Sequence, residues 1–417
     1  MSHSFNRTTT IAALDIGSSK VCCIIAKIGR DKKINIIGYG YNGSKGVKNG
    51  IITDIEQATL SACNAVESAE QLANEIIDRV IINISGEKLK SSIKASTISI
   101  NCNKAVGDNE INKVIEKSLQ KIEKNDEDLI HCMPIGYKID EGEEIKDPRN
   151  MFGDKLSVDI LAGLVPSAPF KNLMTVIENS HLEIAGQAMS AYASGLACLV
   201  DDEKEIGATI IDIGGGTTSI ATFKNGHPVN FSTIAVGGFN VTNDIAWGLT
   251  TSITHAERLK TLHGCAFLSN QDMTETLNVY PVGEEDDTNI KQIQRSDLIN
   301  IISPRIEETF ELISKKLKEQ GLDNMPNHRV VLTGGASQLP GMREIASLIL
   351  DKQVRIGKPR NILGLPDSLT NPAFSTSVGL LLFALNYSEK KSYDSQAKLK
   401  DGKSGFGKIL SWLKNNF

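Results

Sequence analysis

The sequence predicts an α/β fold with a duplicated core of two domains and two small inserted subdomains. One phrase occurs twice, as T-I-A-A-L-D-I-G-S-S-K at residues 10–20 and as A-T-I-I-D-I-G-G-G-T-T at residues 208–218. Each copy has an apolar run, an acidic residue, a glycine-rich turn and a second apolar run, which is typical of a β-hairpin. A third phrase, R-V-V-L-T-G-G-A-S-Q-L-P-G at residues 329–341, predicts a buried strand, a tight turn and a helix. Each phrase alone is weak, but the three together, at domain-scale spacing, indicate two related core domains.

The glycine-rich turns indicate a bound phosphate. Because glycine has no side chain, its backbone N–H groups can approach a phosphate closely, and the neighbouring Ser or Thr hydroxyls add further donors. A carboxylate beside a phosphate would be repelled unless a cation lay between them. Asp15 and Asp212 therefore indicate Mg²⁺ that is held mostly through its own water molecules. Two hairpins that face each other would hold one polyphosphate from both sides.

The three phrases resemble the phosphate-1, phosphate-2 and adenosine motifs of the ATPase superfamily that contains actin, hexokinase and DnaK. Within this superfamily the chain resembles the FtsA family of actin-like bacterial cell-division proteins. The phrases that carry the finer resemblance are G-G-F-N-V-T-N-D-I-A at 237–246 and H-A-E-R-L-K-T-L-H-G-C-A at 255–266, together with the amphipathic C-terminus. The resemblance covers about residues 8–388 and the tail. It implies the actin-like ATPase fold, with ATP and Mg²⁺ as ligands.

The resemblance also implies roles for individual residues. Asp15 and Asp212 would orient the water molecules of Mg²⁺, and Lys20 would supply a countercharge. The expected phosphate contacts are Gly17, Ser18, Ser19, Lys20, Gly214, Gly215, Gly216, Thr217 and Thr218, with Gly237 and Gly238 in a turn nearby. The expected ribose and base contacts are Glu257, Lys260, Gly334, Gly335 and Ser337. Taken alone, Glu257 and Lys260 could equally form an ordinary salt bridge on a helix surface.

Hydrolysis in this superfamily uses a polar side chain and an ordered water in place of a covalent nucleophile. Gln187 is the candidate for that side chain, although an amide that lines the core is an equal alternative. We therefore expect ATP binding with at most slow ATPase activity.

Length and composition exclude several other classes of protein. The chain has 417 residues and a net charge of −5. It therefore lacks the excess of positive charge that is typical of proteins that bind nucleic acid. No run of about 20 apolar residues occurs, so no segment is expected to span a bilayer, and the N-terminus lacks an apolar signal core. The seven cysteines include no C-x-x-C pair, which favours buried reduced thiols over zinc sites or disulfides. We expect a cytoplasmic protein.

The chain divides into two core domains that are each split by an insertion, followed by a linker and a short helix. The predicted segments are the first core domain at 8–86 and 167–205, an inserted α/β subdomain at 87–166, the second core domain at 206–255 and 328–387, a second insertion at 256–327, a flexible linker at 388–404 and an amphipathic helix at 405–417. The first insertion follows the fourth predicted strand. This position resembles FtsA and differs from actin, MreB-type filaments and DnaK-type chaperones.

Three helices within these segments have predicted boundaries or contacts. Asp54 is expected to cap the helix that follows the third strand. Ser303 is expected to cap another helix, with Pro304 at its first position and Gly321 at its end. The small residues of M-S-A-Y-A-S-G-L-A at 189–197 predict a helix that crosses a second helix closely, as at a hinge between lobes. An alanine-rich helix that merely packs in the core would give the same pattern.

The C-terminus predicts an amphipathic helix that binds a membrane surface. The apolar side of this helix, with Trp412 at its edge, consists of Phe406, Ile409, Leu410, Leu413 and Phe417. Lys408 and Lys414 would face anionic lipid. At about 1.5 Å per residue the helix is too short to cross a bilayer, so it would lie in the interface. The alternative is a helix that docks on this protein or on a partner.

The resemblance implies a protein that polymerises on the inner face of the cell membrane at the division site. It would tether filaments of FtsZ, the tubulin-like division protein, and recruit later divisome proteins. The C-terminal peptide of FtsZ would dock on residues 256–327, with Arg295 and Arg305 as candidate anchors. Arg295 could equally be a solvated charge at a helix start. The alternatives are a superfamily kinase, a DnaK-type chaperone, which would need a separate β-sandwich domain, and a pilus-assembly actin homologue.

Overall fold

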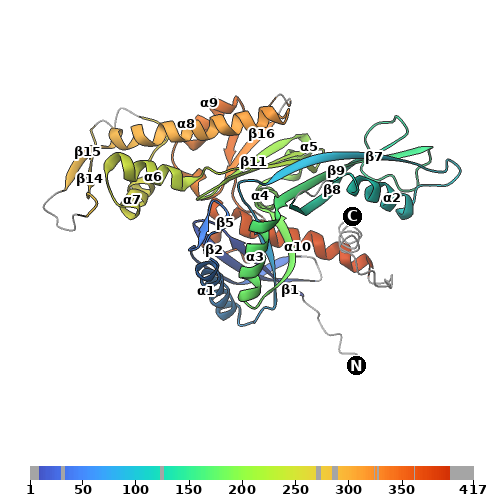
Figure 1. The fold of residues 1–417 in the computed structure, drawn as a ribbon, viewed down its shortest axis with the longest axis horizontal. Coiled ribbons are helices and arrows are strands. Elements are labelled where there is room, and N and C mark those ends of the chain that lie inside the picture. The colour runs from blue at the N-terminus through green and yellow to red at the C-terminus, as the bar shows by residue number, and fades with distance from the viewer. Residues whose placement is uncertain are drawn as a thin grey trace.

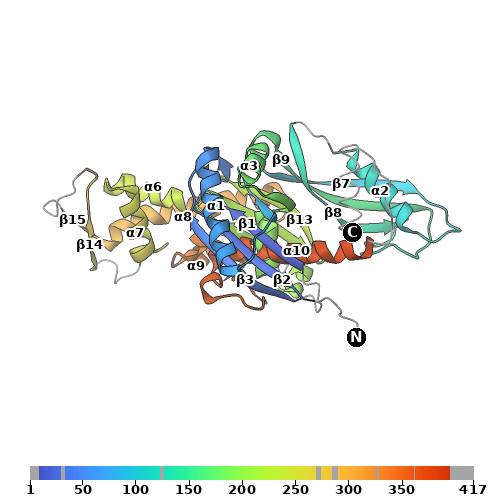
Figure 2. The ribbon, with the colours of Figure 1, turned by 90° about the horizontal axis from the view of Figure 1, so that it is seen from below.

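The computed structural model arranges the helices and strands of the chain in two lobes and an elongated extension (Figure 1). The described residues are 9–29, 33–122, 126–268, 274–283, 290–323, 325, 328–360 and 362–394, with 386–394 described in backbone only. Figures 1 and 2 place the extension, which carries β7, β8 and β9, at one end of the long axis. A hairpin of β14 (Thr276–Val279) and β15 (Lys291–Gln294) lies at the other end.

The first lobe is built on a sheet whose described strands have the order β10-β6-β1-β2-β3. These strands are β1 (Thr9–Ile16), β2 (Lys20–Ile28), β3 (Ile34–Gly43), β6 (Arg79–Ile84) and β10 (Glu183–Met189). The helices α1 (Ile55–Ala73) and α10 (Ser375–Asp394) both contact β2. Every residue of β2 from Val21 to Ala26 is buried, so both faces of this strand are covered. The predicted cap of α1 is confirmed, because the Asp54 carboxylate accepts a hydrogen bond from Gln57 N.

The second lobe and the inserted subdomain share one sheet. Its described strands have the order β17-β16-β11-β12-β13-β7-β9-β8. The strands of the lobe are β11 (Ala208–Ile213), β12 (Thr218–Lys224), β13 (His227–Ile234), β16 (Arg329–Thr333) and β17 (Gln353–Ile356). The inserted subdomain supplies β7 (Lys90–Ser99), β8 (Glu127–Ile139), β9 (Lys155–Pro166) and the helix α2 (Asp108–Leu119).

The two parts of this sheet meet between β13 and β7. The strands pair through Ser232 and Lys90, and Ser91 Oγ donates to Phe231 O at 2.9 Å and accepts from Phe231 N at 2.7 Å. The insertion therefore interrupts the first lobe in sequence but extends the sheet of the second lobe in space. The sequence does not predict this continuity, because one residue pair leaves no recognisable pattern.

The remaining described elements connect or cover the sheets. They are β4 (Val47–Lys48), β5 (Ile51–Ile52), α3 (Ser167–Asn179), α4 (Ser190–Cys198), α5 (Asp201–Ile206), α6 (Gly238–Leu249), α7 (Ile253–His263), α8 (Arg295–Glu319), α9 (Met342–Leu350) and the 3₁₀ turns η3 (Gly335–Gln338), η4 (Asp367–Leu369) and η5 (Pro372–Phe374). In Figure 1, α8 and α9 lie above the sheet of the second lobe, and α6 and α7 lie between that sheet and the β14–β15 hairpin.

The predicted start of α8 is wrong. The helix begins at Arg295, and Pro304 lies inside it instead of at its first turn. Leu298, Ile299 and Ile302, which precede the proline, are completely buried. Their burial outweighs the cost of an internal proline, which is roughly 3 kcal/mol. The predicted end is confirmed, since α8 stops at Glu319, just before Gly321, whose φ is +67°.

The close helix crossing that residues 189–197 predict is confirmed. The helices α4 and α10 cross where the two lobes meet. A Cβ atom on Gly379 of α10 would overlap the carbonyl group of Ala193 in α4. The backbones touch at this point, which requires small residues on both helices.

The end of α10 also differs from the prediction. The helix runs to Asp394, so residues 388–394, assigned to a flexible linker, are helical. This stretch contains Glu389 and two lysines, which favour helix, and neither proline nor glycine interrupts it. The rest of the linker, 395–404, and the amphipathic helix at 405–417 lie outside the described residues. In the part of the chain that is described, no helix has the length and apolar character needed to cross a membrane.

Candidate functional site

Two hairpin turns of the same construction face each other between the lobes. The turn after β1 is closed by a hydrogen bond from Gly17 N to Lys20 O at 3.0 Å, and the turn after β11 by one from Gly214 N to Thr217 O at 2.9 Å. A Cβ atom on Gly215 would lie 2.9 Å from Ser19 Cβ, which cannot rotate away, and one on Gly216 would lie 2.8 Å from Ser18 Oγ. The predicted facing hairpins are therefore confirmed, and their approach requires glycine.

A small cavity of about 90 Å³ lies between the two turns. Predicted nucleotide and metal contacts from both lobes line it. The predicted phosphate and metal contacts in its lining are Asp15, Gly17, Ser18, Ser19, Lys20, Asp212, Gly214, Gly215, Gly216 and Thr217. Gly334 and Gly335, which were predicted as ribose and base contacts, also line it. Backbone N–H groups, hydroxyls and one lysine thus converge on a space that is suited to phosphate oxygens. We call this space the phosphate cavity and the turns at 17–20 and 214–217 the phosphate turns.

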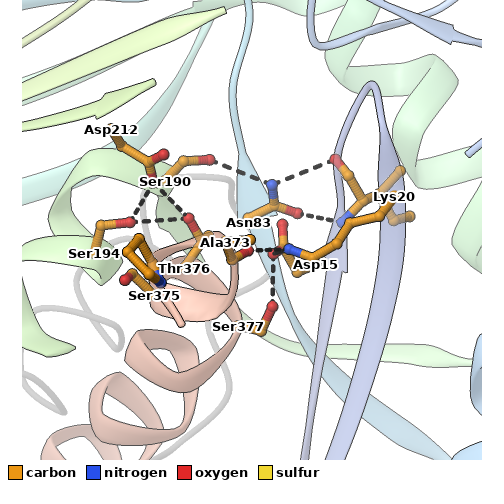
Figure 3. Close-up of polar contacts among 12 residues, drawn as sticks. Asp15, Lys20, Asn83, Ser190, Ser194, Asp212, Ala373, Ser375, Thr376 and Ser377 are labelled. Carbon is orange, nitrogen blue, oxygen red and sulfur yellow. Dashed lines mark hydrogen bonds and ion pairs between the residues drawn. The ribbon is translucent and has the colours of Figure 1, made fainter. Parts of the chain in front are cut away.

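The two aspartates are held by hydroxyl groups of the crossing helices (Figure 3). Ser377 Oγ donates to Asp15 Oδ2 at 2.7 Å. Ser194 Oγ and Thr376 Oγ1 donate to Asp212 Oδ2 at 2.5 Å and 2.8 Å. Because α10 supplies Thr376 and Ser377 as neighbours, one helix fixes a carboxylate in each lobe.

Lys20 lies beside the first carboxylate, as Figure 3 also shows. Its Nζ atom is 3.9 Å from Asp15 Oδ2 and donates to Ala373 O. It also lies 4.3 Å from the centre of the Phe374 ring, which is a cation–π distance. The ammonium group is therefore held at the edge of the phosphate cavity, where the resemblance implies a countercharge.

Burial raises the pKa of the Asp212 carboxyl above its usual value, and the nearby charge of Asp15 raises it further, against the hydrogen bonds from Ser194 and Thr376 and the charge of Lys20. A cation would relieve the repulsion between the two carboxylates. Among the described residues, no group of three or more His, Cys, Asp or Glu side chains could enclose a metal ion. Two carboxylates fit Mg²⁺, which keeps several of its water molecules and takes other ligands from phosphate oxygens.

A larger cavity of about 460 Å³ shares Ser19, Gly214, Gly215 and Gly335 with the phosphate cavity. Its volume lies in the range of about 300–1,000 Å³ that is typical of sites for small ligands. The predicted residues Gly237, Gly238, Glu257 and Lys260 line it together with the apolar side chains of Phe239, Ile306 and Met342. A flat ring with polar edges would suit such walls, so the two cavities together could hold a nucleotide.

Lys260 and Glu257 are more than a surface ion pair. Lys260 Nζ donates to Glu257 Oε2 at 2.7 Å, to Gly238 O at 3.1 Å and to Thr242 Oγ1 at 2.8 Å. The lysine side chain is only 15% exposed. These bonds tie α7 to the first turn of α6, so the pair shapes the wall of the larger cavity.

Known proteins match the chain over nearly its whole length. The family model for Cell division protein FtsA matches residues 209–379, and the model for the SHS2 domain inserted in FtsA matches residues 86–162. The FtsA of Agrobacterium fabrum is 37% identical, with 99% of this chain and 96% of the relative covered, and that of Escherichia coli is 30% identical, with 97% and 96% covered. The chain belongs to the FtsA family of cell division proteins.

Solved structures of low sequence identity share the fold of this FtsA-family chain. The PilM–PilN type IV pilus biogenesis complex has a TM-score of 0.63 at 14% identity, with 90% of this chain and 98% of that chain covered. MreB5 of Spiroplasma citri bound to ADP has a TM-score of 0.55 at 14% identity, with 93% and 98% covered. These likenesses confirm the predicted actin-like α/β fold.

Two residues that the FtsA resemblance assigned to nucleotide contacts do not line either cavity. Thr218 is buried, and its hydroxyl donates to Val236 O at 2.8 Å. Ser337 is also buried, and its hydroxyl donates to Gly334 O at 2.7 Å. Both hydroxyls hold nearby backbone in place, so these residues support the site without facing it.

The geometry does not support Gln187 as the hydrolytic residue. Gln187 pairs with Ile82 between β10 and β6 and lines neither cavity. The amide that does line the phosphate cavity is Asn83, which the sequence reasoning missed. Asn83 accepts from Ile16 N at 2.8 Å and donates to Ser190 Oγ at 3.3 Å. A single polar residue within the apolar run V-I-I-N-I at 80–84 was the signal that could have identified it.

The two arginines predicted to anchor an FtsZ peptide have partners within the chain. Arg295 donates to His263 O at 2.8 Å and to Glu275 at 3.1 Å. Arg305 donates to both carboxylate oxygens of Asp244, at 2.5 Å and 3.1 Å. An acidic peptide would have to displace these internal bonds, so the geometry does not favour either guanidinium group as an anchor.

Proposed function

We propose that this FtsA-family chain binds ATP with Mg²⁺ between its lobes and polymerises on the cytoplasmic face of the cell membrane. The phosphates would lie between the turns at 17–20 and 214–217, and the base would lie beside Glu257 and Lys260. The water molecules of Mg²⁺ would be held by Asp15 and Asp212, where the ion would neutralise phosphate charge. The observation that carries the proposal is that two turns of the same construction line one cavity. The MreB5 of Spiroplasma citri, which has the same fold and is bound to ADP, supports it.

We expect at most slow ATP hydrolysis. Of the described residues that line the phosphate cavity, Asp15 and Asp212 are the carboxylates, and Asp212 Oδ2 already accepts two hydrogen bonds. The Asn83 amide already accepts a hydrogen bond from Ile16 N and donates one to Ser190 Oγ. Activation of water would therefore depend on positioning, without a strong base, which favours a long-lived ATP-bound state.

We assign attachment to the membrane to residues 405–417, where the sequence predicts an amphipathic helix and which lie outside the described residues. Its large apolar side chains could contribute on the order of 10 kcal/mol if they were fully buried, but interfacial burial is partial and the tail must also be ordered. One tail would bind lipid modestly, whereas several tails on one polymer would bind with a higher effective concentration. Self-association and membrane attachment would therefore reinforce each other.

The C-terminal peptide of FtsZ would dock on the surface formed by α6, α7 and the β14–β15 hairpin. Trp247 is 88% exposed and Val282 is 60% exposed on this surface. The segments that carry them are joined by a hydrogen bond from Val282 N to Thr250 O at 3.1 Å and by a β-bridge between Thr251 and Pro281. Exposed apolar residues on adjoining segments are typical of a protein-binding surface. We therefore place the peptide on this surface. Val282 lies inside the predicted docking region at 256–327, and Trp247 precedes that region in the sequence.

Recruitment of later divisome proteins at the division site completes the proposed role. The FtsA relatives cover nearly the whole chain, which favours this role over a superfamily kinase. The PilM likeness, at 14% identity, carries the fold alone and gives no support for a role in pilus assembly.

The experiment that tests this role is the binding of a fluorescent FtsZ C-terminal peptide to the full chain, measured by fluorescence polarisation. We expect saturable binding, weakened about tenfold by Trp247→Ala, because a large exposed aromatic side chain is a typical binding hot spot. Leu348→Ala is the matched control, since Leu348 is 78% exposed on α9, outside this surface. Absence of peptide binding by the unmodified chain would contradict the proposed role.

A further inference from the structure

A short hairpin between β3 and α1 reaches the phosphate cavity. It consists of β4 and β5, which pair through Val47 with Ile52 and Lys48 with Ile51. Its tip is Asn49–Gly50, with φ values of +50° and +71°. Positive φ at both central residues defines a type I′ turn, for which Asn-Gly is a strongly preferred sequence. The tip therefore has a fixed backbone shape, which Gly50 permits.

One side of this tip contacts both phosphate turns. Gly50 N donates to Ser18 Oγ at 2.9 Å. In the other turn, a Cβ atom on Gly216 would lie 2.9 Å from Asn49 N. Because the Ser18 hydroxyl accepts a hydrogen bond from Gly50, its own proton stays available for donation to an anion. The hairpin tip thus orients the hydroxyl of Ser18, which is one of the predicted phosphate contacts.

The other side of the tip contacts the start of the inserted subdomain. A Cβ atom on Gly50 would lie 2.7 Å from Ser85 Oγ and 3.0 Å from Gly86 N. A cavity of about 320 Å³ lies beside this contact. It is lined by the hairpin, by the entry segment 85–89 of the inserted subdomain, by the exit residues Val165 and Pro166, and by α3. Both chain connections of the subdomain therefore border one space that leaves room for movement.

The base of the hairpin is fixed more firmly than its tip. Thr53 N and Asp54 N donate to Gly46 O at 2.8 Å and 3.2 Å, and Ser44 N donates to Ser19 O at 3.1 Å. Asp54 is also the cap of α1. A change at Ser18 would therefore act on the tip, which also contacts Ser85 and Gly86, while the base stays fixed.

We propose that the Asn49–Gly50 tip is a positioning element for the phosphates and transmits nucleotide occupancy to the inserted subdomain. This inference rests on the proposed binding of ATP. A phosphate that accepts a hydrogen bond from the Ser18 hydroxyl would strengthen the bond from Gly50 N, because hydrogen bonds in a chain polarise one another. The tip would then hold the entry segment 85–89 in one arrangement. Without nucleotide, the tip and the entry segment would move into the adjoining cavity.

Two variants test the positioning role by isothermal titration calorimetry of the full chain with ATP and Mg²⁺. Gly50→Ala forces a side chain into positive φ and against Ser85 and Gly86, so we expect ATP to bind about tenfold more weakly. Gly43→Ala is the matched control, because a Cβ atom on Gly43 meets no other atom within 4 Å. Equal ATP affinity of the two variants would overturn the positioning role.

Hydrogen–deuterium exchange on the unmodified chain tests the transmission without any substitution. We expect ATP to slow exchange in residues 85–89 by about three- to tenfold, the effect of one net hydrogen bond, while β17 stays unchanged as an internal control. If ATP binds but residues 85–89 exchange at the same rate, the inference is wrong and the proposed ATP binding stands. If ATP does not bind at all, both the proposed function and the inference fall.

Discussion

At the scale of single residues, the site depends on hydroxyl groups that come from outside the two phosphate turns. Thr376 and Ser377 are neighbours on α10, yet one bonds the carboxylate of Asp212 and the other that of Asp15. The helix that joins the lobes is therefore bonded directly to both proposed metal-orienting groups. A change in the charge between the carboxylates would act on the hinge without any intermediate element.

Asp212 illustrates a conflict between stability and binding. Its pKa is raised by burial, so its charged form costs stability above that pKa, and the cost disappears when the group is protonated. We expect Asp212→Asn to stabilise the nucleotide-free chain by about 1 kcal/mol at neutral pH and to abolish Mg²⁺-dependent ATP binding. Urea unfolding and calorimetric titration measure the two effects, with exposed Asp202→Asn as the control. A destabilised Asp212→Asn variant would contradict this assignment.

His131 makes the stability of the fold dependent on pH. Burial lowers its pKa to about 3, and its Nε2 accepts from Met189 N at 2.9 Å. Because the unfolded chain binds this proton more readily, the stabilisation is complete above about pH 6.5 and is lost as the pH falls toward 3.

We therefore expect His131 to contribute a loss of roughly 2 kcal/mol in unfolding free energy between about pH 7 and pH 5. Urea unfolding at both pH values measures this loss. His131→Gln keeps an acceptor for Met189 N but cannot take up a proton, so it should lose less stability over the same interval. An equal loss in both proteins would show that other groups cause the acid sensitivity.

At the scale of elements, the crossing of α4 and α10 fixes how the lobes meet. We expect Gly379→Ala to destabilise the fold by about 1–3 kcal/mol, because a Cβ atom there would overlap the backbone of Ala193. Gly186→Ala is a matched control, since its Cβ atom would meet Phe383 at an ordinary distance of 3.6 Å. Denaturant titration compares the two variants. A Gly379→Ala variant as stable as Gly186→Ala would show that the crossing has room to adjust.

Elements with a local signal could be predicted from the sequence. The two hairpins and the Asp54 cap depend on residues that are close in the chain, and the structure confirms them. Pro304 misled the prediction of α8, because its local preference is overridden by the buried residues that precede it. The polar stretch at 388–394 misled the prediction of a linker, because lack of apolar periodicity does not prevent a helix.

The parts of the site that come from distant segments could not be predicted. The hydroxyl groups that donate hydrogen bonds to the two carboxylates lie on α4 and α10, far from Asp15 and Asp212 in the chain. The pairing of β7 with β13 brings the inserted subdomain onto the second lobe through a contact that has no sequence pattern. Asn83 was missed for a different reason, since Gln187 was chosen by resemblance without a local signal.

At the scale of the whole molecule, the proposed nucleotide site lies between two lobes that carry the outlying parts. The inserted subdomain and the β14–β15 hairpin lie at opposite ends of the long axis (Figure 2). A small rotation at the hinge would therefore move these ends through a larger distance. This geometry suits a protein whose contacts with its neighbours in a polymer depend on the bound nucleotide.

The proposed coupling of polymerisation to membrane binding predicts a dependence on protein concentration. We expect co-sedimentation with anionic vesicles to rise more steeply than single-site binding as the concentration increases, because polymers present several tails at once. Deletion of residues 405–417 should abolish it. Binding by the full chain that follows a single-site curve under polymerising conditions would contradict the coupling.

The central claim is that one Mg²⁺–nucleotide is held by both phosphate turns. Titration of the full chain with ATP, with and without Mg²⁺, tests it most directly when it is repeated on Lys20→Ala in the first turn and Gly216→Val in the second. The account predicts one ATP per chain, dependent on Mg²⁺, and severe loss of binding in both variants. ATP binding that survives unchanged when either turn is altered would contradict it.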